Sequence, residues 1–593
     1  MTNAEIARVL QEIADLLSIC NENVFKIRSY ERAAEAVGGT SVSVEDLASR
    51  GELQTLPGIG KSIEEVITEL VTVGDCQYRQ QLLGQAPEGL LELLRIPGFG
   101  PKKAGLVYRE LGIASITELE AAAREGRLKG LPGFGSKTET KILAGLEQLK
   151  AGTERALLGS ALPLAEALVD AVRGQAAVIA AEMAGSARRR RETVGDLDIL
   201  ATSADPAAVC KWFATAGQLA EVELAGETKV SGRTVSGLKV DLRVLAPESF
   251  GAALQYFTGS QQHNIRLRER AQKRGLTISE YGVFEGEPGQ KGRQVAGETE
   301  ESVYEAVGLP WIPPELREDR GEIEAAEEGR LPRLVEVADF RTDLHLHTEA
   351  SDGHMTLEQL AETGCGLGYT HLGITNHSQA LVIANGLDRD ALLRQIEQIR
   401  KLNEHAQGCM LLAGTEADIL IDGSLDVPED VWPELDFAIG SIHSGFSGDV
   451  DKMTSRVVTA LKSGRIDILG HPTGRLILGR KGYDLHLEEV IAAAVEHQVA
   501  LEINASPYRL DLSDVNARLA VSKGALLSIN TDAHYREELQ LLKYGVMTAR
   551  RGWVEAESVI NTWELGRLRG WLAERRKKEK SHTKTSRRAT HPR

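Results

Sequence analysis

Histidine is concentrated in one part of this chain, and the concentration indicates metal chemistry. Of the 14 histidines among 593 residues, eleven lie between His345 and His534, and imidazole is the commonest side-chain metal ligand. The segment DLHLHT places His345 and His347 on one face of an expected strand, because strand side chains alternate. A shell of imidazole and carboxylate suits Mn²⁺, Zn²⁺ or Fe²⁺ better than Mg²⁺ alone. Seven further candidate ligands follow, nearly all at the ends of apolar runs: Asp352, His377, Glu416, His443, His471, Asp532 and His534.

A second candidate site consists of aspartates. Asp196 and Asp198 in GDLDIL are two residues apart, so on a strand both side chains project from one face. Asp241 in KVDLRV is a third carboxylate on an expected strand. Such carboxylates can hold two Mg²⁺ or Mn²⁺ ions that activate a 3′-hydroxyl and stabilise a leaving pyrophosphate. Taken alone, the D-x-D pattern favours surface aspartates beside a solvated arginine run.

The residues upstream of these aspartates are suited to binding phosphate. Gly185 and Ser186 allow a close backbone approach to phosphate oxygens, and Arg189 offers a planar donor for a triphosphate. Basic residues are concentrated in the run 188–191 and in the tail 575–593. Such local patches indicate nucleic-acid binding better than the net charge of −17, which argues superficially against it.

Three similar pentapeptides stand near the N-terminus, each between helical patterns. LPGIG (56–60), IPGFG (96–100) and LPGFG (131–135) predict repeated helix–turn–helix units. The helix after each turn begins with free backbone N–H groups that can take a DNA phosphate without reading a base. Ordinary helical hairpins are the alternative, but three copies with a following lysine favour DNA binding. The candidate DNA-binding residues are Gly58, Gly60, Lys61, Gly98, Gly100, Lys102, Lys103, Gly133, Gly135 and Lys137.

The pattern changes after Thr153 to alternating strands and helices. VIAAEMAGSARR, GDLDILATS, GLKVDLRVL and AALQYFTGS supply β-branched and apolar runs between Gly and Ser breaks. The charged stretch 313–333 lacks a large apolar face and is expected to form a connector. From about Ala338, short apolar runs alternate with helical stretches, which is the rhythm of a βα barrel. The polar and basic last twenty residues are expected to be disordered.

Composition is that of a soluble globular protein with about four compact units. Apolar residues make up 42% and charged residues 26% of the chain. No apolar run approaches the roughly 20 residues that span a bilayer, and the N-terminus shows no export signal. The five scattered cysteines fit reduced thiols. We therefore expect a cytoplasmic, nucleoid-associated protein with no membrane partner.

The motifs around the aspartates resemble those of the family X DNA polymerases. The set G-S-x-R-R, G-D-x-D, a later isolated Asp, YFTGS and N-x-x-x-R lies within residues 1–320, and GLPWIPPELREDRGEIEAA stands near its end. The resemblance implies that Asp196, Asp198 and Asp241 are catalytic metal ligands of a nucleotidyltransferase palm. An aromatic ring beside the sugar can exclude a 2′-hydroxyl, and Asn can reach a minor-groove acceptor. Simple core packing is the alternative for the two aromatic residues. The implied nucleotide-binding residues are Gly185, Ser186, Arg189, Gly195, Tyr256, Phe257, Gly259, Asn264 and Arg268.

One departure concerns 5′-deoxyribose-phosphate removal. Relatives with that activity carry a lysine on the helix after the first hairpin, where this chain has Val66. Valine cannot form the Schiff base that the reaction needs. Lys26, Arg28 and Lys61 remain candidates for binding a 5′-phosphate only.

The histidine-rich segments resemble the polymerase-and-histidinol-phosphatase (PHP) domain over about 340–572, supported by EINASPYRLDL. The resemblance implies a distorted (βα)₇ barrel with up to three metals. His345, His347, Glu416 and Asp532 would hold the first ion; Glu416 would bridge to a second ion with His443 and His471; Asp352, His377 and His534 would hold the third. Asn376 stands where the family usually has Asp, which affects the surroundings of the ligands more than their number. Surface or core roles are expected for His354, His371, His405, His486 and His497.

The sequence thus predicts a multidomain α/β repair polymerase with a metal-dependent 3′→5′ exonuclease, a 3′-end-processing activity or an AP endonuclease. Its partners would be gapped or nicked duplex DNA and deoxynucleoside triphosphates, its state a monomer, and Na⁺ or K⁺ could bind the hairpins. The alternatives are a DNA-anchored nuclease whose polymerase half positions DNA, a non-catalytic end-binding scaffold, and a small-molecule phosphatase with a DNA anchor. The expected parts are a helical hairpin domain (1–80), fingers (81–152), palm (153–246), thumb (247–316), linker (317–337), PHP domain (338–573) and basic tail (574–593).

Overall fold

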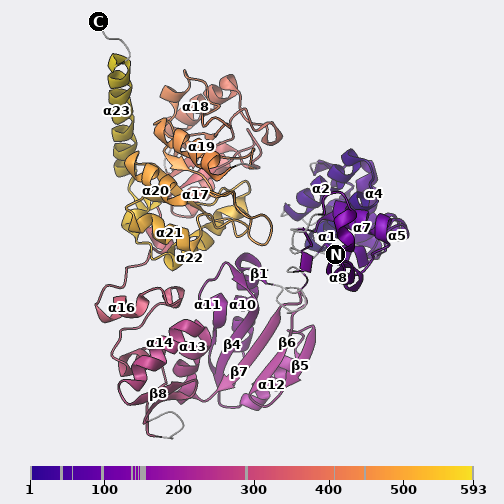
Figure 1. Cartoon of the computed structure of the whole chain (residues 1–593), viewed down its shortest axis with the longest axis vertical. Helices are drawn as coiled ribbons and strands as arrows, with labels where there is room; N and C mark the ends of the chain where they lie inside the picture. The colour runs from indigo at the N-terminus through magenta and orange to yellow at the C-terminus, as the bar shows by residue number, and fades with distance from the viewer. Residues whose placement is uncertain are drawn as a thin grey trace. The chain divides into compact units, whose positions relative to one another are not determined.

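The chain forms two compact units, Met1–Glu154 and Arg155–Arg593. The computed structural model (Figure 1) describes residues 3–39, 44–56, 58–87, 89–94, 96, 99–134, 138–139, 142–143, 146, 155–286, 292–405, 408–446 and 449–589. Gly98, Gly135 and Lys137, three of the candidate DNA contacts, lie outside these residues.

The first unit is helical and has one hydrophobic core. Leu10, Leu17, Ile67 and Leu90 are among its fully buried side chains. Gly60 and Gly100 each immediately precede a helix, so no side chain of the capping residue covers its first N–H groups. The helices are α1 (Asn3–Ile19), α2 (Val24–Gly39), α3 (Val44–Arg50), η1 (Leu53–Thr55), α4 (Lys61–Val73), α5 (Gln77–Leu83), α6 (Gly89–Leu93), α7 (Pro101–Leu111), α8 (Ile116–Arg124) and η2 (Arg127–Gly130).

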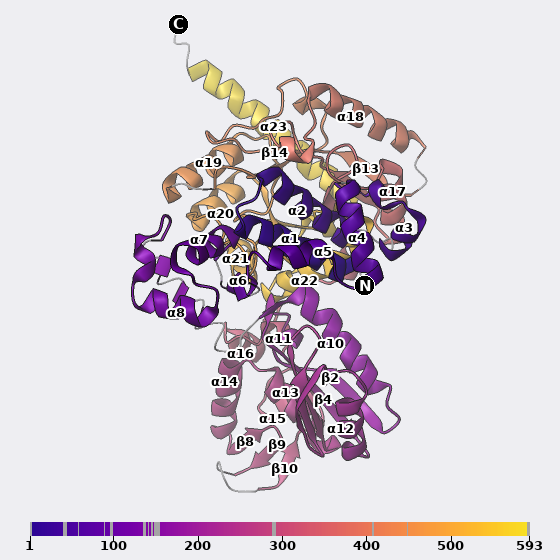
Figure 2. The ribbon, with the colours of Figure 1, turned by 90° about the vertical axis from the view of Figure 1, so that its right-hand side faces the viewer.

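The second unit begins with the palm, a five-stranded sheet in the order β2-β4-β7-β6-β5. Only the central pair β4 and β7 is parallel. Helices α10 and α12 pack on one face, and α13 covers the other (Figure 2). The elements are β1 (Ala156–Leu157), α10 (Leu158–Arg173), β2 (Val178–Met183), α11 (Gly185–Arg188), β3 (Thr193–Val194), β4 (Asp196–Ser203), α12 (Pro206–Thr215), β5 (Glu221–Ala225), β6 (Lys229–Arg233) and β7 (Lys239–Leu245).

The thumb follows, and it corrects one expected strand. AALQYFTGS, taken as a strand-like run, lies largely in helix α13, because Phe250, Ala253, Leu254 and Phe257 recur with helical spacing and pack together on the palm. The elements are η3 (Pro247–Ser249), α13 (Phe250–Thr258), α14 (Gln261–Gln272), β8 (Leu276–Ser279), β9 (Gly282–Glu285), β10 (Gln294–Ala296), α15 (Glu300–Ala306), η4 (Pro314–Leu316) and α16 (Glu322–Glu327).

The charged stretch 313–333 differs from the expected connector. Leu316, Ile323 and Ala326 belong to the thumb core. Arg317 is fully buried and lies 2.6 Å from Glu300, so part of the charge in this stretch is paired inside the protein. Part of the stretch expected to form a connector without a large apolar face is therefore packed into the thumb core.

The PHP domain is a barrel of parallel strands. Strands β13 and β14 continue one another through Gly414 and Thr415, so the described residues form seven strands. The Leu346–Ala533 bridge joins the first strand to the segment after the last and closes the barrel. The strands are β11 (Thr342–Leu346), β12 (His371–Ile374), β13 (Met410–Ala413), β14 (Glu416–Asp418), β15 (Ile439–Ser441), β16 (Ile468–Leu469), β17 (Ala500–Asn504) and β18 (Leu527–Asn530).

Helices surround this barrel, and the last one extends into the expected basic tail. Arg575 is 6% exposed and pairs with Asp467 at 2.9 Å, and the helix continues to Ala589, so the start of the expected tail packs against the barrel. No described helix is long and apolar enough to cross a membrane. The helices are η5 (Val337–Asp339), α17 (Leu357–Gly366), η6 (Val382–Ala384), α18 (Arg389–Glu404), η7 (Trp432–Glu434), α19 (Val450–Lys462), α20 (Leu487–Glu496), α21 (Asp514–Ser522), η8 (Arg536–Leu541), α22 (Leu542–Arg551), η9 (Ala556–Ser558), η10 (Ile560–Thr562) and α23 (Leu565–Ala589).

Palm and barrel share a hydrophobic core. Leu510 and Tyr544 of the barrel pack with Leu158 and Leu162 of helix α10. A Cβ at Gly159 would lie 2.5 Å from Pro507 of the barrel. The two domains are therefore in close contact.

Candidate active sites

The three aspartates of the palm meet on adjacent strands. The parallel register of β4 and β7 places Asp198 beside Asp241, and Asp196 beside Lys239. Burial, followed by the charges of Asp196 and Asp241, raises the pKa of Asp198 to about 6. The Oδ1 atom of Asp241 is buried without a hydrogen-bond partner in the described structure, and its Oδ2 lies 3.1 Å from Lys229 Nζ. Carboxylates this close are stabilised by a nearby cation, so the donor set fits a divalent ion.

Gly185 lies directly against Asp198. Its φ is +63°, and a Cβ built on it would stand 2.7 Å from Asp198 Oδ2, so only glycine fits without strain. The preceding Ala184 N–H donates to the Asp198 carbonyl at 2.8 Å. Ser186 follows in the short helix α11, and Gly195 immediately precedes β4. The turn expected to bind phosphate therefore stands beside the aspartates.

Arg189 is held by the end of the thumb. Its Nε lies 3.1 Å from Glu318 Oε1, and its Nη1 donates to the Thr258 carbonyl. Arg188 pairs with Glu300 through two hydrogen bonds of 2.7 Å. An incoming triphosphate would have to compete with Glu318 for Arg189.

The expected sugar-binding turn ends helix α13. The rings of Tyr256 and Phe257 meet edge to face with centroids 5.2 Å apart, and Arg243 stands over Phe257 at 4.6 Å. Gly259 has φ +69°. Asn264 donates to the Tyr256 carbonyl at 2.7 Å.

The two expected contacts to the nascent pair lie on helix α14. The Asn264 side chain is nearly buried and also accepts a 2.7 Å hydrogen bond from Gln255. Arg268 lines a pocket with Ile265 and Thr277. Asn264 thus fixes the end of α13 in this conformation, whereas Arg268 faces open space.

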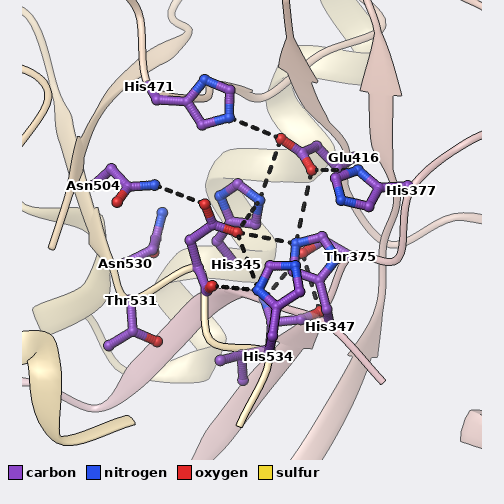
Figure 3. A network of polar contacts seen from close by, with 12 residues as sticks. His345, His347, Thr375, His377, Glu416, His471, Asn504, Asn530, Thr531 and His534 are labelled. Carbon is purple, nitrogen blue, oxygen red and sulfur yellow. Dashed lines mark hydrogen bonds and ion pairs between the residues drawn. The ribbon is translucent and has the colours of Figure 1, made fainter. Parts of the chain in front are cut away.

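Glu416 is the centre of the barrel's histidine cluster. It is 1% exposed, and Figure 3 shows its carboxylate directed at imidazoles from several strands. Its Oε1 lies 3.2 Å from both His443 Nε2 and His471 Nε2 and 3.4 Å from His345 Nε2. Its Oε2 lies 2.8 Å from His377 Nδ1. Burial raises the pKa of Glu416, but the charges of His443, His345 and His377 hold it well below its usual range.

Two more carboxylates complete the cluster. Asp532 Oδ1 lies 3.1 Å from His347 Nε2 and 3.5 Å from His345 Nε2. Asp352 Oδ2 lies 3.4 Å from His377 Nε2 and 3.4 Å from His534 Nε2. The structure therefore brings all nine predicted ligands together. Eight of them form three groups that share His347 and His377, and His471 joins them through its contact with Glu416.

The donor atoms of this cluster fit metal ions better than a polar core. His345 Nε2, both ring nitrogens of His347 and Glu416 Oε2 are buried without a hydrogen-bond partner in the described part of the chain. Burial lowers the pKa of His347 to about 3, which keeps the ring neutral and able to ligate. Unpaired buried polar atoms are costly, so converging ones indicate a missing partner. Mixed N and O donors are those of a transition-metal centre.

Several carboxylates behind the cluster were not singled out from the sequence. Glu502 is fully buried and lies 2.7 Å from His345 Nδ1, while the His471 N–H donates to it at 2.6 Å. Asp418 lies 3.1 Å from His443 Nδ1. Such partners fix the tautomer and orientation of ligating imidazoles. Both carboxylates lie on strands of the barrel, but nothing in the sequence pattern separates them from other acidic residues.

Asn376 supports the loop that carries Asp352. Its Oδ1 accepts from the Thr348 N–H at 2.7 Å and from Ser351 Oγ at 2.8 Å. Its Nδ2 donates to Gln395 at 2.5 Å. An aspartate could not make that last bond, which agrees with the departure noted in the sequence.

The described hairpin residues are exposed at the helix starts. Gly58, Gly60 and Lys61 precede or begin α4, and Gly100 and Lys102 do so at α7. Gly58 has φ +80° and Gly133 φ +82°, which favours glycine. The partly exposed Lys103 also lies in the first turn of α7.

Comparison with known proteins agrees with this architecture. Family models match a helix-hairpin-helix domain (1–76), a SAM-like helix-hairpin-helix tandem (90–148), a DNA polymerase beta thumb (253–318) and a PHP domain (343–506). A palm with three aspartates, this thumb and a histidine-lined PHP barrel define the class of family X polymerases fused to a PHP domain. The DNA polymerase/3′-5′ exonuclease PolX of Bacillus subtilis (strain 168) is 38% identical over 574 residues, which are 96% of this chain and 99% of that protein. The chain belongs to this bacterial PolX family.

The PHP domain also resembles free-standing proteins. A probable phosphatase of Thermoanaerobacter sp. (strain X514) is 27% identical over 40% of this chain and 96% of its own length. A probable phosphatase of Caldicellulosiruptor bescii is 31% identical over 34% of this chain and 82% of its own length. The barrel is therefore a fold that also occurs without a polymerase.

Proposed function

We propose that this chain is a DNA-directed DNA polymerase that fills short gaps during repair and that its PHP domain removes nucleotides from DNA 3′-ends. The relative with nearly full-length coverage carries both activities in its name. The observation that supports the proposal is that candidate ligands gather at two places: Asp198 lies beside Asp241 in the palm, and nine histidines and carboxylates, Glu416 among them, lie together in the barrel.

In the palm, Asp196, Asp198 and Asp241 would hold two Mg²⁺ or Mn²⁺ ions, which when bound supply the charge that activates a 3′-hydroxyl and stabilises pyrophosphate. The Gly185–Ser186 turn would bind the triphosphate through backbone N–H groups. Tyr256 and Phe257 would exclude a 2′-hydroxyl by contact with the sugar. Asn264 and Arg268 would contact the nascent pair after Asn264 exchanges its bond to the Tyr256 carbonyl.

In the barrel, up to three ions of Mn²⁺, Zn²⁺ or Fe²⁺ would be held as the contacts suggest. His345, His347, Glu416 and Asp532 would form the first group; Glu416, His443 and His471 the second; Asp352, His377 and His534 the third. Bound ions supply a hydroxide at neutral pH and neutralise the phosphodiester. Glu502 and Asp418 orient His345 and His443 for this task.

The hairpins would bind the DNA backbone without reading bases, together with Na⁺ or K⁺ at the turns. The substrate would be gapped or nicked duplex bound by a monomer. Removal of 3′-phosphates is a second candidate for the barrel, favoured by the similarity of this domain to the two probable phosphatases. AP endonuclease action is a third reaction open to the same metal centre.

Two separate assays test these assignments. Template-directed extension of a primer in a single-nucleotide gap is expected to disappear in Asp241→Asn but to persist in Asp205→Asn, an aspartate that only caps α12. Release of mononucleotides from a 3′-labelled strand is expected to disappear in Glu416→Gln. If Glu416→Gln instead loses only 3′-phosphate release, the barrel is an end-cleaning phosphatase; if the wild type never extends a primer, the polymerase proposal fails.

A further inference from the structure

A pocket of about 240 Å³ lies between the palm, the end of the thumb and the barrel. It is lined by Arg190 and Arg191 of the palm, Arg320 beside α16, and Arg475 and Arg551 of the barrel. None of the five belongs to either set of candidate catalytic residues. The pocket therefore has a chemistry that the two active sites do not explain.

Two of these guanidinium groups have donors without an oxygen partner. Within the described residues, Arg190 Nη1 donates a hydrogen bond to the sulfur of Met183 at 3.5 Å, and no oxygen accepts from the Arg190 guanidinium. Burial is the main reason that the pKa of Arg190 is lowered. Arg475 Nε is buried with no hydrogen-bond partner in the same part of the chain. Guanidinium carries five donors, and leaving a buried one unpaired is costly, so the Arg475 side chain indicates a missing acceptor.

The charge of the lining points to an anion. Five arginines face two carboxylates of the lining, Glu192 and Asp514. Glu192 accepts from Arg475 at 2.7 Å, and Asp514 accepts from Arg320 at 3.0 Å and from Arg551 at 2.8 Å. Glu318, just outside the lining, also pairs with Arg551 at 3.0 Å and with Arg191 at 3.4 Å. Three carboxylates thus pair with four of the five arginines, and positive charge remains in excess.

We propose that this pocket binds a phosphate group. A phosphate offers several oxygens to guanidinium forks and neutralises the excess charge. Its source is either a phosphodiester of a DNA strand or a free phosphate, such as a nucleoside monophosphate.

The lining of the pocket includes residues that lie close in sequence to both active sites. Arg190 directly follows Arg189 of the palm's arginine run, and Arg475 lies four residues after the barrel ligand His471. A phosphate held here touches the two segments at once. The pocket thus provides a binding step between the sites, either for a strand that moves from one to the other or for a nucleotide released by the barrel.

Binding of inorganic phosphate, dTMP and a ten-nucleotide oligothymidylate to the full chain tests this assignment. Arg190→Ala/Arg475→Ala is compared with the wild type, and Arg394→Ala, an exposed arginine on α18, controls for the loss of positive charge. Glu192→Gln controls for the weakened domain contact, because it removes the negative charge that pairs with Arg475 while leaving every arginine in place.

The proposal predicts a loss of at least about tenfold in affinity in the double variant, the size expected for charged hydrogen bonds. A loss for phosphate and dTMP identifies free phosphate as the ligand. A loss confined to the oligonucleotide, with a reduced salt dependence, identifies a phosphodiester. Glu192→Gln is expected to strengthen binding, because it removes a negative charge from the lining.

The proposal is overturned if none of the three ligands binds more weakly to the double variant than to Arg394→Ala. It is also overturned if Glu192→Gln weakens binding as much as the double variant does, since the arginines would then act only by joining the domains. If the double variant does not fold, Glu192→Gln is tested alone: stronger binding supports the proposal, and weaker binding overturns it.

Discussion

The Arg551 guanidinium of the PHP domain donates a 2.6 Å hydrogen bond to the Arg189 carbonyl of the palm. The same group lies 3.0 Å from Glu318 and 2.8 Å from Asp514. Arg189 lies just after the Gly185–Ser186 turn of the candidate nucleotide site. Arg551 of the barrel therefore fixes the backbone next to the nucleotide site of the palm.

Replacing Arg551 is expected to destabilise the chain. Arg551 is 4% exposed, and Arg551→Ala removes the positive charge that pairs with Glu318 and Asp514. Removing one partner of a buried ion pair lowers the free energy of unfolding by about 3–5 kcal/mol. Urea unfolding followed by tryptophan fluorescence measures the effect. The control is Arg389→Ala, whose two ion pairs are largely exposed. Equal stability losses in the two variants would show that this contact does not support the domain interface.

The Glu300 cluster predicts sensitivity to acid. Burial raises the pKa of Glu300, but hydrogen bonds and charge from Arg188 and Arg317 lower it from 4.5 to about 2. A folded pKa below the unfolded one means that this stabilisation is present above about pH 4.5 and is lost as the pH falls toward 2. At about 1.4 kcal/mol per pKa unit, the contribution is at most ~3.5 kcal/mol.

Unfolding free energies of wild type and Glu300→Gln across this range measure the effect. The difference between them is expected to be largest near pH 5 and to shrink toward pH 3. Glu301→Gln, an exposed neighbour, serves as the control. A difference that stays constant with pH would contradict the assignment of the shifted pKa to Glu300.

Glu502→Gln is expected to impair the barrel and spare the palm. Glu502 holds the ring of His345 and the backbone of His471, and loss of such a partner typically lowers metal affinity or activity about 10- to 100-fold. Mn²⁺ binding and mononucleotide release are measured together with primer extension. Glu496→Gln, exposed on α20, is the matched control. Unchanged metal binding in Glu502→Gln would show that this carboxylate has only a packing role.

Deoxyribose-phosphate lyase activity is expected to be absent. Val66 is 7% exposed in the core of the helical unit, and no amine stands at that position to form a Schiff base. Borohydride reduction in the presence of a 5′-deoxyribose-phosphate substrate is expected to trap no covalent complex. A trapped complex that is lost in Lys61→Ala would contradict this prediction and assign the reaction to Lys61.

The sequence pointed to residues that the structure brings together, because candidate metal ligands leave a strong chemical signal. Two histidines or two aspartates on one face of a strand are unusual in a hydrophobic core. His345 and His347 form one such pair, and Asp196 and Asp198 form another. The carboxylates that orient the candidate ligands are harder to predict. In the sequence, Glu502 cannot be distinguished from a surface glutamate, and its role depends on the pairing of its strand with β16.

The fold was less predictable where charge is buried. Arg317 lies in the charged stretch that was expected to form a connector. In the structure its charge is paired with Glu300, 17 residues earlier, inside the thumb. Helix α13 was hidden for a different reason, since a short apolar run fits a strand or a helix equally well. The structure of such segments is decided by the pairing of charges and the packing of side chains in the folded protein.

The central claim, that one chain holds two independent active sites, is tested on a gapped, 5′-phosphorylated duplex with a labelled primer and Mn²⁺. Extension and shortening are measured for the wild type, Asp198→Ala and His345→Ala. We expect Asp198→Ala to lose extension and keep shortening, and His345→Ala to do the reverse. Loss of both reactions in either variant, with folding intact, would contradict the claim.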